Sequence, residues 1–152
     1  MPVRRGPKKN GGQAEQALGR SRGGFSTKIP ITVDGVGYPL RLRLTAGQRH
    51  DITQAPDLID GFKFEHVIAD GSYTGQDFVD WVIENGMEAV IPSPKNAKQP
   101  REYDAWRYRE RHLVECFIGK IKHFRRVFSR FDKLATRYLG FLHLTCVLIG
   151  LR

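Results

Sequence analysis

The stretch FEHVIADGSYTGQDFVDWVIENGMEAVI, residues 64–91, determines the expected fold. Its first part, residues 64–69, is a short and largely apolar run, which predicts a buried strand that stops at Asp70. Gln76–Asn85 carries apolar residues at helical spacing and is followed by a glycine, a common helix stop. Met87–Ile91 is typical of a second short strand, ended by a proline. A strand, a helix and a strand in this order indicate a mixed α/β layer fold.

Upstream of this stretch, the sequence predicts a hairpin and a short helix. Ser26–Val33 and Tyr38–Thr45 alternate apolar with polar residues on either side of a turn signal at residues 34–37. Ile52–Ile59 is consistent with a short helix. Residues 1–24 are rich in Gly, Lys, Arg and Gln and carry few large apolar side chains, so we expect a flexible basic arm, with order beginning near Phe25.

Downstream, the pattern becomes helical. Residues 92–105 contain three prolines and predict a loop. Trp106 to about Phe128 is a proline-free amphipathic stretch that predicts one long helix, and Leu134–Leu151 predicts a second, more apolar helix. We therefore expect residues 25–152 to form one domain, since a chain of 152 residues with 40% hydrophobic content suits a single core.

Composition restricts the location and the redox state of the chain. No uninterrupted apolar run reaches the roughly 20 residues that a membrane span needs, and the basic start lacks a following apolar stretch. We expect a cytoplasmic protein. Its two cysteines, Cys116 and Cys146, lie in apolar stretches and are too few for a disulfide framework. We interpret them as reduced and structural.

The charge is strongly basic and unevenly placed. The chain has 25 Lys and Arg against 16 Asp and Glu, a net charge of +9. Residues 1–28 carry seven basic residues against one acid, and residues 101–137 carry eleven against five. Such an excess favours a polyanionic partner, although two solvated basic faces explain the charge about equally well when it is taken alone.

Asp70 and the predicted long helix carry the candidate chemistry. A carboxylate at the end of a buried strand is held rigidly while its tip faces solvent, although an aspartate that merely opens a turn is an equally good interpretation of Asp70. On the helix, Arg111, Glu115 and Lys122 fall within about 60° of one another at roughly 100° per residue. One face then presents a carboxylate between two cations, which in an arbitrary basic helix indicates only exposed ion pairs.

The spacing Tyr108-x-x-Arg111-x-x-x-Glu115-x-x-x-x-x-x-Lys122 resembles the signature of the Asp-Asp-Glu (DDE) transposases of bacterial insertion sequences, in the IS-four/IS-five-like group. All four positions and all three gaps match. Residues 68–73, Ile-Ala-Asp-Gly-Ser-Tyr, are similar to the segment that holds the second Asp of this family. The stretches at residues 19–28, 44–51 and 90–92 are also similar to the family, so the resemblance covers about residues 11–152.

This resemblance implies a ribonuclease H-like fold, a mixed sheet flanked by helices, in which three carboxylates hold two Mg²⁺ ions for cutting and joining DNA. Asp70 and Glu115 would be the second and third catalytic, metal-binding acids. Arg111 and Lys122 would contact the phosphates of transposon ends, and Tyr108 would position the end DNA. The implied partners are double-stranded DNA, as transposon ends and target, and a second copy of the chain in a homodimeric active complex.

The resemblance also implies that the first strand and its catalytic Asp are missing, since both precede the basic glycine-rich region in this family. Asp34 and Asp51 match non-catalytic positions of the family, so neither replaces the missing first catalytic Asp. We therefore expect the chain to be inactive or nearly so alone, and to work with an upstream-frame polypeptide or as a fusion with it. The alternative is a catalytically silent DNA-binding or regulatory remnant, which leaves the Tyr-Arg-Glu-Lys spacing unexplained.

Two further interpretations are weaker. His112 and Cys116 lie one helical turn apart and would form half of a metal site, but two ligands favour a packing role. A small basic RNA-binding protein is disfavoured by the lack of an aromatic-rich strand motif.

Overall fold

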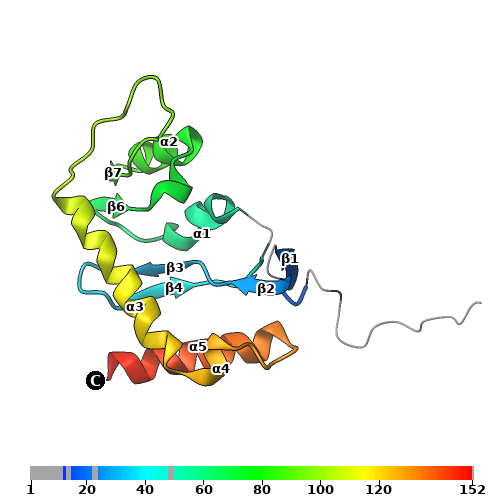
Figure 1. The fold of residues 1–152 in the computed structure, drawn as a ribbon. Coiled ribbons are helices and arrows are strands. Elements are labelled where there is room, and N and C mark those ends of the chain that lie inside the picture. The colour runs from blue at the N-terminus through cyan, green and yellow to red at the C-terminus, as the bar shows by residue number, and fades with distance from the viewer. Residues whose placement is uncertain (1–11, 13–14, 22–23, 48–49, 152) are drawn as a thin grey trace, which may run out of the picture. The chain divides into compact units, whose positions relative to one another are not determined.

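A computed structural model describes residue 12 and residues 15–21, 24–47 and 50–151 (Figure 1). These residues divide into two compact units, and the single domain expected over residues 25–152 stays a prediction. The first unit comprises residues 1–29, 43–49 and 121–152, and the second comprises residues 30–42 and 50–120. Each unit is discontinuous in sequence, which is why the order of residues along the chain shows no boundary between them.

In the second unit, the predicted strand, helix and strand are all present. β6 (His66–Ile68) and β7 (Glu88–Val90) pair in parallel, and α2 (Gln76–Glu84) connects them. Their core also includes η1 (Asp51–Gln54) and α1 (Ala55–Ile59), which confirm the short helix expected at Ile52–Ile59. The most deeply buried side chains of this core are those of Val79, Val82 and Ile91.

The predicted hairpin is confirmed, with an interruption. β3 (Ile31–Val33) pairs antiparallel with β4 (Pro39–Leu42) in the second unit. The turn is closed by Asp34, whose carboxylate accepts hydrogen bonds from the amides of residues 36 and 38 at 3.0 and 2.9 Å. Gly37 adopts a φ of 91°, a conformation that favours glycine. The outer part of the hairpin forms a separate pair, β2 (Gly24–Lys28) with β5 (Thr45–Ala46), in the first unit.

Order begins earlier than the arm prediction allowed. β1 (Gly19–Ser21) pairs antiparallel with β2, so part of the segment at residues 1–24 forms a strand. The backbone just before β1 is held by Arg130, which donates to the carbonyl of Gln16 at 2.8 Å and to the hydroxyl of Thr27. Arg130 lies more than 100 positions from each of these two partners, so the local composition of residues 1–24 does not predict the contacts. Residues 1–11, 13, 14, 22 and 23 lie outside the described residues, so the arm stays a prediction for them.

The single helix predicted from Trp106 to about Phe128 is wrong. The chain instead forms η3 (Arg107–Arg111), α3 (His112–Lys122) and α4 (Arg125–Phe128). The break is at Phe124, whose φ of −88° and ψ of 102° are extended. Ile121 and Val127 are both buried, yet six positions of a straight helix would turn them about 120° apart. Breaking the helix lets both side chains be buried.

The second predicted helix is confirmed as α5 (Ala135–Gly150), part of the first unit. Tyr138 and Leu142 are its most buried large side chains, and the hydroxyl of Tyr138 donates a 2.7 Å hydrogen bond to the carbonyl of Val127 in α4. This bond joins the two helices inside a buried environment. No helix among the residues that the structure describes is long and apolar enough to cross a membrane.

Candidate functional site

Asp70 lies directly after β6, at the start of the single turn η2 (Gly71–Tyr73). Its Oδ1 atom accepts a 2.8 Å hydrogen bond from the amide of Ser72 and a 2.5 Å hydrogen bond from the hydroxyl of the same residue. The carboxylate therefore caps the turn, which is the structural role that a turn aspartate would have. The cap also orients the side chain, because it engages one oxygen twice and leaves Oδ2 outside both contacts.

Glu115 and Arg111 form an ion pair across one turn of the helical segment. The guanidinium Nη1 atom of Arg111 lies 2.6 Å from Oε1 of Glu115. The hydrogen bond to Glu115 raises the pKa of Arg111 above its ordinary value, and the negative charge of Asp70 contributes in the same direction. Because the two side chains are 32% and 56% exposed, the pair contributes at most about 1 kcal/mol to stability.

Tyr108 joins the same cluster. The guanidinium carbon of Arg111 lies 5.9 Å from the centre of its ring, and Tyr103 packs edge-on against it at 5.4 Å. Partial burial raises the pKa of Tyr108, with Arg111 lowering it and the charges of Asp70 and Glu115 raising it further. The charges of Asp70, Arg111 and Glu115 therefore all act on the ring of Tyr108.

The structure thus brings together four of the five residues expected in the site: Asp70, Tyr108, Arg111 and Glu115. Lys122 is exposed at the last position of α3 and belongs to the first unit, and its role stays a prediction. The packing of β6 against η3 accounts for the grouping, because it brings the strand that ends at Asp70 beside the segment that carries Tyr108 and Arg111.

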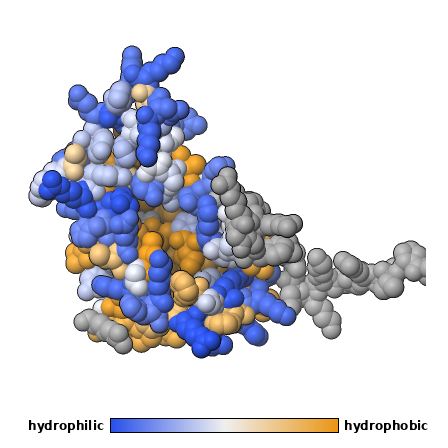
Figure 2. Space-filling model, in the orientation of Figure 1, coloured by the Kyte–Doolittle hydropathy of each residue, from blue (hydrophilic) through white to orange (hydrophobic). Residues whose placement is uncertain are grey.

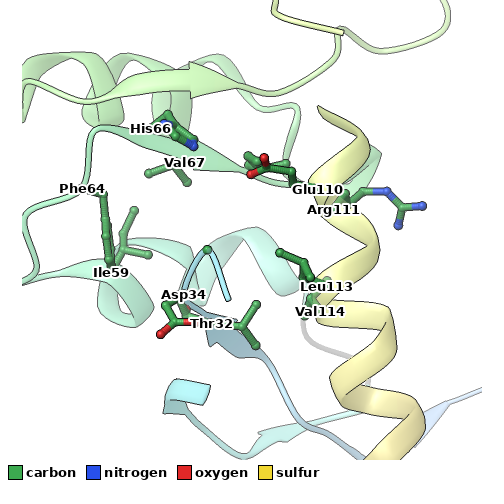
Figure 3. A pocket seen from close by; sticks show the side chains of 13 residues that line it. Thr32, Asp34, Ile59, Phe64, His66, Val67, Glu110, Arg111, Leu113 and Val114 are labelled. Atoms are coloured by element: carbon green, nitrogen blue, oxygen red, sulfur yellow. The ribbon is translucent and has the colours of Figure 1, made fainter. Parts of the chain in front are cut away.

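A cavity of about 180 Å³ lies in the second unit beside this cluster (Figure 3). It is bordered by β3, α1, β6 and the start of α3, and mostly apolar side chains line it. Figure 3 shows that Glu110 points toward the cavity, whereas Arg111 points away from it. His66 also lines it, and its buried Nδ1 atom has no hydrogen-bond partner.

Sequence reasoning did not single out Glu110 or His66. Glu110 directly precedes Arg111, so it lies on another face of the segment than the Arg-Glu-Lys stripe. His66 stands within an apolar strand, where a histidine is more often part of the core. For His66, a polar residue within an apolar run was the available signal.

The carboxylates of the site fit part of a metal centre. Mg²⁺ prefers oxygen ligands and is often held by one or two carboxylates together with substrate phosphates. Asp70 and Glu115 supply such oxygens, one from a strand end and one from a helix. Across the residues that the structure describes, however, no three of His, Cys, Asp or Glu form a group that would hold a metal ion. This finding includes His112 and Cys116, whose spacing on α3 is the half-site considered above.

The environment of Tyr73, three residues after Asp70, yields a prediction on alkaline stability. Burial, together with the negative charges of Asp51 and Asp70, raises the pKa of Tyr73 from 10.0 to about 12. The folded protein therefore holds the phenol proton more tightly than the unfolded chain does. Stability from this group is complete below pH 10 and is lost as the pH rises through 12. We expect the Tm to fall over this range, and to fall less in Tyr73→Phe.

The control for this prediction is Tyr38→Phe, since Tyr38 is 47% exposed. Its Tm should follow that of the wild type between pH 9 and pH 12 when all three proteins are scanned in the same buffers. A wild-type profile in Tyr73→Phe would contradict the prediction.

A basic α/β protein that presents two carboxylates beside an arginine and a tyrosine has the chemistry of a protein acting on nucleic-acid phosphates. Comparison with known proteins narrows this class. The family model of the transposase DDE domain matches residues 2–149. The chain belongs to this family, and its function is DNA transposition. The family implies an enzyme with endonuclease and strand-transfer activity that binds DNA and uses divalent metal ions.

Two relatives illustrate the similarity. The protein named as a transposase of insertion sequence element IS6501 from Brucella ovis is 37% identical over 132 residues, covering 84% of this chain and 100% of that protein. The protein named as a transposase of insertion sequence element IS402 from Burkholderia cepacia is 32% identical over 135 residues, covering 81% of this chain. That alignment spans 62% of the Burkholderia protein, so the relative extends well beyond it. No solved structure matches the chain.

Proposed function

We propose that this chain supplies the second and third carboxylates, Asp70 and Glu115, of a three-carboxylate centre that cuts transposon ends and joins them to target DNA. One observation carries the proposal. β6, which ends just before Asp70, contacts η3, whose Arg111 pairs with Glu115 at 2.6 Å, although Asp70 and Glu115 are 45 positions apart in the sequence. Two Mg²⁺ ions in the complete site would polarise the scissile phosphate and activate the attacking water or DNA 3′-hydroxyl.

The protein residues have separate tasks in this proposal. The carboxylate oxygens of Asp70 and Glu115 would hold the ions, and the turn at η2 keeps Asp70 in place through its bonds to Ser72. Arg111 neutralises Glu115 through the 2.6 Å ion pair, and with metal ions bound to Glu115 it would be available to a DNA phosphate. A guanidinium suits this role because it contacts phosphate with two parallel N–H groups. Lys122 adds a point charge for the DNA backbone, and Tyr108 stacks on the end DNA.

We further propose a ribonuclease H-like fold whose first strand, with the first catalytic Asp, comes from an upstream polypeptide. Among the described strands, β3 pairs with β4 alone and β6 pairs with β7 alone. The amide of Glu88 donates to the carbonyl of Glu65 at 2.9 Å, so alternate residues of β6, His66 and Ile68, present their backbone groups at the opposite edge.

His66, Ile68 and the β3 residues Thr32 and Val33 all line the cavity of Figure 3. An added strand in this place would join the two sheets and satisfy the open edges. The same strand would bring a carboxylate close to the end of β6, where Asp70 lies. The working enzyme in this proposal is a cytoplasmic homodimer assembled on the two transposon ends.

The test joins the upstream reading frame to this chain and measures Mg²⁺-dependent cleavage of the element's own end DNA. We expect the fusion to cleave and the chain alone to show no cleavage above background, because one carboxylate of the centre is absent. The upstream polypeptide by itself serves as the control and should also be inactive. Cleavage by the chain alone at the rate of the fusion would overturn the proposed incompleteness. A silent fusion would favour the alternative, a DNA-binding or regulatory remnant.

A further inference from the structure

The segment from α4 to the start of α5 combines exposed aromatic rings with concentrated positive charge. Phe128 is 68% exposed and Phe131 is 59% exposed, although burying a phenylalanine ordinarily stabilises a protein by about 1.5 to 3 kcal/mol. Residues 125–137 contain five basic residues and one acid. Figure 2 shows hydrophobic and hydrophilic residues interleaved over α4 and α5, at the bottom of the view. The candidate site described above uses none of the residues 125–137.

Three of these side chains lie next to one another. Arg125 and Phe128 are one helical turn apart on α4 (Arg125–Phe128), which places them on the same side of it. The guanidinium carbon of Arg125 lies 5.8 Å from the centre of the Phe131 ring. Arg126, by contrast, stacks on Phe141 at 4.3 Å and is directed elsewhere. We call Arg125, Phe128 and Phe131, together with the exposed Lys133, the aromatic–arginine surface.

The backbone beneath this surface is held in place. Arg130, between Phe128 and Phe131, donates to the carbonyls of Asp132 at 3.0 Å and Lys133 at 3.3 Å. The same guanidinium binds the carbonyl of Gln16 at 2.8 Å and lies 5.1 Å from the ring centre of Tyr138. Burial lowers the pKa of Arg130, which agrees with a structural rather than a solvent-facing role. Phe131 and Lys133 therefore project from an ordered loop, and little ordering entropy opposes binding to them.

Exposed rings and fixed cations in alternation suit one kind of partner. Aromatic faces stack on unpaired nucleic-acid bases, worth about 1 to 3 kcal/mol per base, while neighbouring cations follow the phosphates. In a duplex the bases are already stacked, so a duplex offers phosphates to Arg125 and Lys133 but no free base to the two rings.

We infer that the aromatic–arginine surface binds a single-stranded stretch of DNA, with Phe128 and Phe131 stacking on unpaired bases and Arg125 and Lys133 contacting phosphates. The inference rests on the proposed function to the extent that DNA is the substrate. It requires neither metal ions nor the upstream polypeptide. Such a surface would hold a DNA strand that has been separated from its complement near a cleaved end.

The test measures fluorescence anisotropy of the whole chain with a labelled 20-mer of dT and with a labelled duplex, both in EDTA. Phe128→Ala and Phe131→Ala should each weaken single-strand binding by at least about fivefold, the lower end of a stacking contribution, and change duplex binding little. Arg125→Gln should weaken both, and should reduce the slope of log affinity against log salt for the single strand by about 0.7. Because EDTA prevents cleavage, failure here is distinct from failure of the proposed catalytic centre.

Matched variants separate ring stacking from simple apolar contact. Phe131→Tyr keeps a flat ring and should bind as the wild type does, whereas Phe131→Leu keeps the apolar volume and should lose binding. Val147→Ala, at an apolar residue 56% exposed on α5, and Lys95→Gln, at an exposed lysine of the second unit, should have no effect. Retained affinity in Phe131→Leu would overturn the inference. Unchanged single-strand binding in the Phe→Ala variants, together with altered self-association in sedimentation, would also overturn the inference. That result would identify the surface as a protein interface.

Discussion

Replacing Asp70 by Asn, or Glu115 by Gln, in the fusion with the upstream frame is expected to lower Mg²⁺-dependent cleavage of transposon ends by at least about 100-fold. Each change removes one negative charge from the proposed metal ligands, and losing a single preorganised electrostatic contact typically lowers kcat by about 10² to 10³. The substitutions are nearly isosteric. The side-chain amide in Asp70→Asn retains an oxygen that can accept from the amide of Ser72, as Oδ1 of Asp70 does at 2.8 Å. The loss would therefore be chemical rather than structural.

Cleavage rates of the two variants should be compared with those of Asp77→Asn and Glu84→Gln, which change exposed acids of α2 in the same way. These controls should cleave as the wild type does, and thermal scans should show all four variants folded. Wild-type cleavage by either Asp70→Asn or Glu115→Gln would refute the assignment of that acid, while leaving membership of the transposase family intact.

A second large effect is expected on stability, from Phe117→Ala. Phe117 is 1% exposed, near the middle of α3 and two positions after Glu115. Removing a fully buried phenylalanine ring loses its transfer free energy and leaves a cavity, at a cost of about 3 to 5 kcal/mol. That is a large share of the total stability of a typical domain, so the helix that carries Glu115 should become mobile. Urea unfolding monitored by circular dichroism measures the effect.

Phe131→Ala is the matched control for this change, because the same atoms are removed from a ring that is 59% exposed. It should lower the free energy of unfolding by less than about 1 kcal/mol, as surface substitutions usually do. Equal costs in the two variants would show that α3 does not depend on this side chain for its packing.

The elements between residues 64 and 91 were predictable because each depends on a local pattern. Apolar runs of strand length, helical spacing and glycine or proline stops all act within a few residues, and β6, α2 and β7 lie within two residues of their predicted ends. The break at Phe124 was not predictable in this way, since the residues around it contain no proline and no glycine. It follows from burying both Ile121 and Val127, which is a requirement of packing.

The candidate site likewise has a part that local sequence predicts and a part that depends on contacts between distant segments. The ion pair between Arg111 and Glu115 follows from a spacing of four in a helical segment, so the sequence alone predicts it. The approach of Asp70 to that pair depends on the contact of β6 with η3, which joins segments about 40 positions apart. Likewise, Glu110 and His66 became candidates only when both were found to line one cavity.

By itself, the sequence determined the α/β class, the strand that presents Asp70 and the spacing of Tyr108, Arg111, Glu115 and Lys122. These features follow from strand and helix periodicities, which depend on residues close together in the chain. The tertiary structure alone decided the division into two units, the strand β1, the helix break at Phe124 and the grouping of Asp70 with Arg111. The physical reason is that burial and long-range hydrogen bonds, such as those of Arg130, depend on residues distant in the chain. Their free energy exceeds the weak local preferences that neighbouring residues express.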